Sequence, residues 1–175
     1  MIDLYMKLMD RLRDNVTELA FINFDSGEVD EPEQNYSIPF PAVLISVETV
    51  NWTDQANGIQ RGDTIILARC CFDVIEDMNN TTPEQIATAA KTKLLLINKI
   101  HSFLQGYGGE TFTKLSRVQS ETEKRADGLF VYNMRYRVNY VDTSAQQDWT
   151  LVKIEGFDVQ KKPFPIPDPV PPVVP

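Results

Sequence analysis

The stretch Leu129-Phe-Val-Tyr-Asn-Met-Arg-Tyr-Arg-Val-Asn-Tyr-Val141 decides the fold class of this chain. Aromatic and aliphatic residues occupy every second position from Phe130 to Tyr140, and Asn or Arg fills most positions between them. Because successive side chains of a strand point to opposite faces, this alternation predicts a β-strand with one buried face and one polar face.

Other segments have strand patterns that can pair with this one. Thr111–Glu121 is expected to form a hairpin with it, through a turn at Ala126-Asp127-Gly128. Ala42–Val50 is rich in β-branched residues, and Thr64–Ile75 has a continuous apolar face at alternate positions. We therefore expect a sheet of mostly antiparallel strands, to which Phe21–Phe24 adds a short one.

Two segments near these strands are harder to interpret. Residues 51–63 are polar and contain two glycines, so they form either a long loop or an extended hairpin arm. Trp149–Val159 has the composition of a further strand.

Two helices are expected beside the sheet. Residues 2–20 have apolar side chains at three- and four-residue spacing, as an amphipathic helix requires. Residues 82–104 repeat that pattern after Thr82, a candidate N-cap, and Pro83, which suits the first helical position. The fold class is therefore α+β, with a small mostly antiparallel sheet and two main helices packed on one face. One such domain is expected over residues 1–160.

The end of the chain differs in composition, and residues 161–175 form a Pro-rich extended tail in this interpretation. Seven of the 11 prolines lie between Pro163 and Pro175, and proline lacks the N–H that a helix or a central strand needs. Phe164 and Ile166 are the apolar candidates in this tail. The tail is either a disordered end or a pre-extended strap that docks on a neighbouring chain.

Composition and charge narrow the function classes. The chain has 175 residues, 42% of them hydrophobic, and a formal charge of −8. The first 58 residues hold 11 of the 25 acidic residues and three of the 17 basic ones, so the net charge lies there. This charge argues against tight binding of nucleic acid. The acidic loop from Asp25 to Glu33 is either a solvated loop or a surface that faces a basic partner or repels DNA.

Targeting signals do not appear in the sequence. Neither a membrane-spanning stretch nor a secretory signal is apparent, so we expect no membrane partner and assembly in a cytosol.

The sequence offers little catalytic chemistry. Cys70 and Cys71 are adjacent, so as strand neighbours they point to opposite faces and are expected to be buried thiols, not a disulfide. His101 is the single histidine, which leaves neither a nucleophile–base pair nor a zinc ligand set. We expect no catalytic residues, no metal site and no cofactor, and hence not an enzyme.

Candidate interface residues lie on the polar sides of the expected strands. Arg69, Arg135 and Arg137 are strand arginines, and Asp73 and Glu48 are acids on possible neighbouring strands. Such groups form either cross-strand pairs on a solvated face or a subunit contact, where Arg is favoured. Further candidates are in the possible arm and in the tail: Trp52, Arg61, Phe164 and Ile166.

The order of these elements resembles a known family. The resemblance rests on the Leu-rich helix Leu4–Leu19, the segment Pro41-Ala-Val-Leu-Ile-Ser-Val47, the strand Thr64–Ile75, the helix ending Leu-Leu-Leu-Ile-Asn-Lys-Ile and the strand Val131–Tyr140. Over roughly residues 1–142 they are similar to the tail terminator (tail completion) proteins of long-tailed bacteriophages and prophages. Trp149–Pro175 goes beyond this pattern.

The resemblance implies a virion protein assembled in the bacterial host cytoplasm. Such a protein forms a hexameric ring that caps the tail tube, ends tube polymerisation and offers a surface for joining the head. Its partners would be copies of itself, the tail tube protein and a head–tail connector protein. DNA would pass through the ring without tight binding.

Three other interpretations stay open. The first is another phage neck, head-completion or baseplate adaptor protein. The second, from a different class, is a small ligand-binding domain or a cryptic enzyme, which requires a concave pocket with convergent polar groups. The third is a module whose tail motif Pro169-Val-Pro-Pro172 recruits a partner domain.

Overall fold

The computed structural model describes residues 2–30, 38–73, 81 and 83–146. Its elements in chain order are α1 Ile2–Asn15, β1 Phe21–Phe24, β2 Ala42–Val47, β3 Asn51–Asp54, the short 3-10 turn η2 Ala56–Gly58, β4 Gln60–Phe72, α2 Glu84–Leu104, β5 Ser116–Glu123 and β6 Phe130–Asp142. The expected strand at Trp149–Val159 and the tail at 161–175 lie outside the described residues.

Over the described residues the sheet has six strands, and five of them follow the order β1-β2-β4-β6-β5. β3 pairs with β4 on the side where β2 also lies, and only the β1–β2 pair is parallel. β4 and β6 are antiparallel partners along their whole length, from Gln60 opposite Asp142 to Phe72 opposite Phe130. The prediction of an α+β fold with a mostly antiparallel sheet is confirmed.

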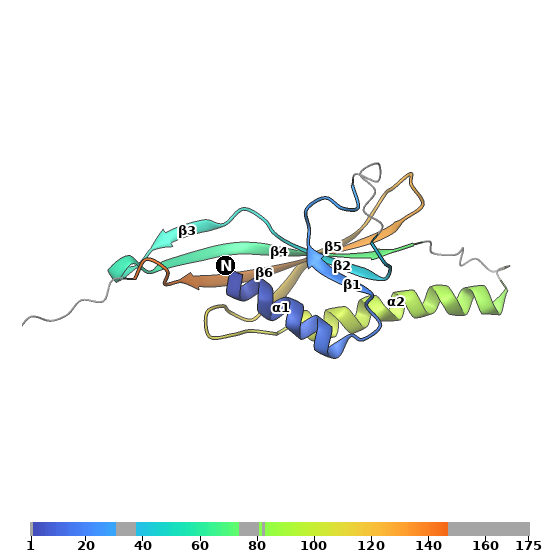
Figure 1. Cartoon of the computed structure of the whole chain (residues 1–175), viewed down its shortest axis with the longest axis horizontal. Helices are drawn as coiled ribbons and strands as arrows, with labels where there is room; N and C mark the ends of the chain where they lie inside the picture. Colours follow the sequence, from blue (N-terminus) through green and yellow to red (C-terminus); the bar gives the residue numbers. More distant parts are fainter. Residues whose placement is uncertain (1, 31–37, 74–80, 82, 147–175) are drawn as a thin grey trace, which may run out of the picture.

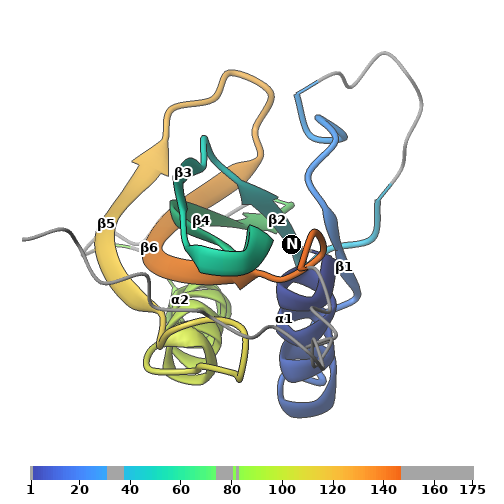
Figure 2. The ribbon, with the colours of Figure 1, turned by 90° about the vertical axis from the view of Figure 1, so that its left-hand side faces the viewer.

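Both helices lie side by side on one face of the sheet (Figure 2). Leu4, Leu8 and Leu12 of α1 are fully buried there, as the three- and four-residue spacing predicts. The apolar side chains of α2 and of the central strands complete this core: Leu96, Ile97, Ile100, Leu104, Val43, Ile45, Ile66, Ala68, Cys70, Phe72, Met134, Tyr136 and Val138. Burying them supplies the main favourable term in folding.

Among the described residues, the opposite face of the sheet is covered at one end only. Val29, from the loop after β1, packs there against Leu44, Cys71 and Val131. Cys70 and Cys71 are thus buried on opposite faces and are free thiols, as expected. Burial raises the pKa of both thiols, that of Cys71 to about 12, so neither is a thiolate at neutral pH.

Several expected boundaries were wrong. The first helix ends at Asn15, not at residue 20, because Ala20 already donates its backbone N–H to the carbonyl of Pro41 at the entry to β1. In the second helix, Pro83 occupies the N-cap instead of Thr82, and no side chain caps that end. β5 begins at Ser116 because residues 111–113 bond separately to the edge of β6.

Residues 51–63 form the extended hairpin arm, not a loop. β3 pairs with residues 60–63, so β4 begins at Gln60, four residues before the expected start. We call β3, η2, residues 60–63 and residues 139–142 the arm. Figure 1 shows the arm extending past the N-terminal end of α1.

A glycine permits the packing within this arm. Gly62 lies between Trp52 and Tyr140 in the register of the three strands, and the two rings meet edge to face with centroids 6.4 Å apart. A Cβ at Gly62 would lie 2.6 Å from Cγ1 of Val50 and 3.1 Å from the Trp52 ring. The missing side chain therefore allows Trp52 to lie across β4.

Gly62→Ala is expected to destabilise the fold by about 1–3 kcal/mol, because the new methyl overpacks the site. Urea unfolding measures the change. In a Val50→Ala background the closest clashing atom is absent, so the same substitution should cost clearly less. An equal cost in both backgrounds would show that this contact is not the cause.

Candidate interaction surfaces

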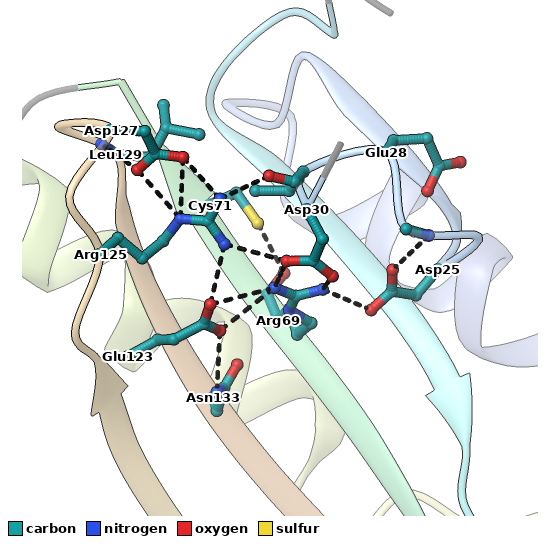
Figure 3. Close-up of polar contacts among 12 residues, drawn as sticks. Asp25, Glu28, Asp30, Arg69, Cys71, Glu123, Arg125, Asp127, Leu129 and Asn133 are labelled. Carbon is teal, nitrogen blue, oxygen red and sulfur yellow. Dashed lines mark hydrogen bonds and ion pairs between the residues drawn. The ribbon is translucent and has the colours of Figure 1, made fainter. Parts of the chain in front are cut away.

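An ion-pair cluster fixes the acidic loop onto the sheet (Figure 3). Arg69 projects from β4 and has a side chain only 8% exposed. Its guanidinium donates to both carboxylate oxygens of Asp30, each at 2.8 Å, to Asp25 at 3.0 Å and to Glu123 at 3.1 Å. This two-pronged geometry suits the planar guanidinium.

A second arginine ties the same loop to the β5–β6 turn. Arg125 donates to Asp30 at 3.0 Å, to Glu123 at 2.8 Å and to the Val29 carbonyl at 2.5 Å. It also pairs with Asp127 in its own turn. Arg69 and Arg125 therefore hold Val29 over the small apolar cluster on this face.

The electrostatics of the cluster favour the ionised carboxylates. Hydrogen bonds from Arg69 and then Arg125 lower the pKa of Asp30 to about 2, although burial opposes the shift. The pKa of each arginine is raised, chiefly by its hydrogen bond to Asp30 for Arg69 and to Asp127 for Arg125. Two carboxylates of the acidic first third, Asp25 and Asp30, are thus paired with arginines of the same chain.

Beside this cluster, half of the sheet face is open to solvent. We define this open half-face by Glu48, Ile65, Leu67, Glu121, Arg135 and Arg137. Ile65 and Leu67 are half-buried, and Arg137 is exposed. Among the residues that the structure describes, no helix or loop covers this half-face. Its two apolar side chains are therefore surrounded by charged ones. A mixed surface of this kind is typical of protein interfaces.

Arg135 forms the cross-strand pairs that the sequence allowed. It donates to Glu48 at 2.9 Å and to Glu121 at 2.5 Å, so it bridges from β6 to both sides. In the part of the chain that the structure describes, Arg137 has no ion-pair partner and lies opposite Ile65 and Ser116. Arg137 is thus the more available of the two for a partner.

The remaining sequence candidates are distributed over separate places. Asp73 lies at the end of β4 and pairs with Lys93 of α2 at 3.0 Å. Trp52 is 40% exposed on one face of the arm, and Arg61 is exposed on the other. Phe164 and Ile166 lie outside the described residues. Arg135 and Arg137 lie on the same face of β6, whereas Arg69 is nearly buried in ion pairs with carboxylates of the same chain.

A hollow of about 860 Å³ lies between α1, the Gly-rich turn after α2 and the arm, and it is the candidate for a ligand site. Of the charged side chains that line it, Arg11 is stacked with its Cζ 5.0 Å from the centroid of the Tyr107 ring, and Arg61 comes from the arm.

His101 is accounted for by packing. Its Nδ1 lies 3.0 Å from the hydroxyl of the buried Tyr136, and burial lowers the pKa of the imidazole. The described residues contain no group of His, Cys, Asp and Glu that could hold a metal ion. Nor is any helix among them long and apolar enough to span a membrane.

The sequence interpretation missed Arg125 and the role of Asp25 and Asp30. Arg125 stands beside the correctly placed turn, and the acidic loop was identified only as a charged segment. The available signal was opposite charge: a turn arginine and a strand arginine against an unusually acidic loop. Which of them meet depends on the loop folding back over the sheet, and no local pattern encodes that path.

Comparisons with known proteins give no family. No family model matches the sequence, and no curated protein matches it. One similar solved structure is a chain from the virion of a native gene transfer agent particle. It has a TM-score of 0.44 and 10% identity over 77% of this chain and 92% of that chain. At that level the similarity carries no inference about function.

Arg69→Met is expected to lower the free energy of unfolding by about 3–5 kcal/mol, because it leaves the nearly buried Asp25 without its cation. The depressed pKa of Asp30 stabilises the fold above pH 3.8, and this contribution is lost as pH falls toward 2. The variant should therefore lose less stability over that window. Urea unfolding between pH 2 and 7 measures both effects.

The matched control is Arg135→Met, which removes a more exposed strand arginine. Its ion pairs are partly solvated, so the expected cost is about 0–1 kcal/mol. Equal costs for the two variants would contradict the structural role given to the Arg69 cluster.

Proposed function

We propose that this chain is a structural virion assembly protein of the tail-terminator kind. In this proposal its copies form a ring, hexameric by the resemblance, on the end of the phage tail tube. The ring ends tube polymerisation and presents the surface on which a head–tail connector protein joins. The observation that carries the proposal is the open half-face, an uncovered mixed apolar and charged surface on an otherwise well-packed domain.

The arm supports the same proposal. A ring requires a heterologous contact, in which one surface of a copy meets a different surface of the next. The open half-face and the arm are two such surfaces, and the arm extends past the N-terminal end of α1 (Figure 1). In the proposed ring, Ile65 and Leu67 contact the neighbouring copy and Arg137 pairs with an acid on it.

Charge supports the passage of DNA without tight binding. The chain has a formal charge of −8, and its arginines at the ion-pair cluster are already matched by carboxylates. Protein groups that grip DNA are mostly free cations that replace counterions. The proposed location is the virion, after assembly in the host cytoplasm.

A second candidate function is another adaptor of the phage neck, head or baseplate. It would use the same surfaces, so the open half-face favours it equally. The position of the gene distinguishes the two, since a place just before the tube-protein gene favours the terminator.

Arg137→Glu is expected to weaken assembly at least tenfold while the fold stays intact, because Arg137 is exposed and its charge would be reversed at the proposed contact. The measurement is the mass of the protein by sedimentation, alone and with tube protein, together with tube length. The wild type should form a ring-sized species and stop tube growth.

Lys91→Glu, on the exposed side of α2, makes the same change of charge outside the proposed contact and should behave as the wild type. A wild type that stays monomeric with tube protein and leaves tube length unchanged would overturn the proposal. Equal effects of the two variants would remove the open half-face as the contact.

A further inference from the structure

One edge of the sheet is left open along nine residues. β1 pairs with β2 only from Ala42 to Ile45, and β3 pairs with β4 alone. In the part of the chain that the structure describes, the outer edge from Ser46 to Asp54 therefore has no neighbouring strand. This edge contains no Lys or Pro, the residues that commonly protect a strand edge.

Two aromatic side chains mark the ends of this open edge. Phe24, at the end of β1, is 44% exposed, and Trp52 of β3 is 40% exposed. Phe24 packs edge to face on Tyr5 of α1, and Trp52 packs on Tyr140 of the core face. Both aromatics therefore lie on the helix-bearing side of the sheet. An added strand would cover both of them.

The chain leaves the described structure at the tip of the arm, near the Asp54 end of this edge. After β6, a turn closes with a hydrogen bond from Gln146 to the Thr143 carbonyl. The turn places Ala145 against Gly58 of η2, so close that a Cβ at Gly58 would lie 2.3 Å from the Ala145 oxygen. Figure 2 shows the end of β6 and η2 side by side at the tip of the arm. The chain is thus carried from β6 toward β3.

The next segment has the pattern and the length of a strand. It reads Trp149-Thr-Leu-Val-Lys-Ile-Glu-Gly-Phe-Asp-Val159 and begins three residues after Gln146. Nine residues of strand span about 30 Å, so residues 149–157 match the open edge from Ser46 to Asp54. A chain that returns from the arm tip runs antiparallel to β3.

We propose that residues 149–157 pair antiparallel with the open edge Ser46–Asp54 of their own chain. This strand covers Trp52 at the arm tip and reaches Phe24 at the base of the arm. The connection of two residues after Gln146 keeps the segment close to its own edge, which favours pairing within one chain over pairing with another. The inference does not depend on the ring.

Hydrogen exchange of the full-length chain tests the proposal. The backbone amides of residues 46–54 that do not donate to β4 should exchange at least tenfold more slowly in the wild type than in Ile154→Pro. Proline removes an N–H and cannot continue the ladder, whereas the matched control Ile154→Val keeps the strand and should keep the protection. Slow exchange that is unchanged by dilution identifies pairing within one chain.

Two results would overturn the proposal. One is exchange at residues 46–54 that is as fast in the wild type as in Ile154→Pro. The other is protection that disappears on dilution, which would assign the covering strand to a second copy. Neither result depends on whether tube protein binds, so the test is separate from that of the proposed function.

Discussion

The structure depends on the uninterrupted antiparallel pairing of β4 with β6. Thirteen residues of each strand match, from the arm tip to the body of the domain. Both helices pack on one face of this strand pair. On the other face the acidic loop covers one end, and the open half-face lies next to the loop. The same ladder continues as the arm, so the body of the domain and the arm share one continuous pair of strands.

Alternation and helical spacing predicted the elements well because they are local properties. The alternation from Phe130 to Tyr140 predicted β6, and the spacing of the leucines in α1 predicted the buried face of that helix. The predicted element boundaries were wrong where backbone hydrogen bonds to distant residues determine them. Ala20 donates to the Pro41 carbonyl after the end of α1, and β3 pairs with Gln60–Asp63, which lengthens β4. The Arg69 cluster could not be predicted, since Asp25 and Asp30 reach it through the path of a loop. The pairing of Arg135 was more predictable, because Glu121 lies on the adjacent strand β5 and Glu48 directly follows β2, which is one strand further across the same sheet.

Charge is used in two different ways in this molecule. Near Arg69 the carboxylates form ion pairs within the chain, and these pairs fix the acidic loop. The lowered pKa of Asp30 is a result of this pairing. On the open half-face, charges instead frame the half-buried Ile65 and Leu67. Charged groups around an apolar centre contribute more to the choice of partner than to affinity. The chemistry of this surface therefore suits selective assembly, and the described residues hold no cluster suited to metal-dependent catalysis.

The central claim is that the open half-face joins one copy to the next. A cryo-electron microscopy reconstruction of the protein bound at the end of a tail tube tests it most directly. The account predicts a closed ring in which Ile65, Leu67 and Arg137 are buried between neighbouring copies. A ring that leaves these three residues facing solvent, or tube ends without any ring, would contradict it.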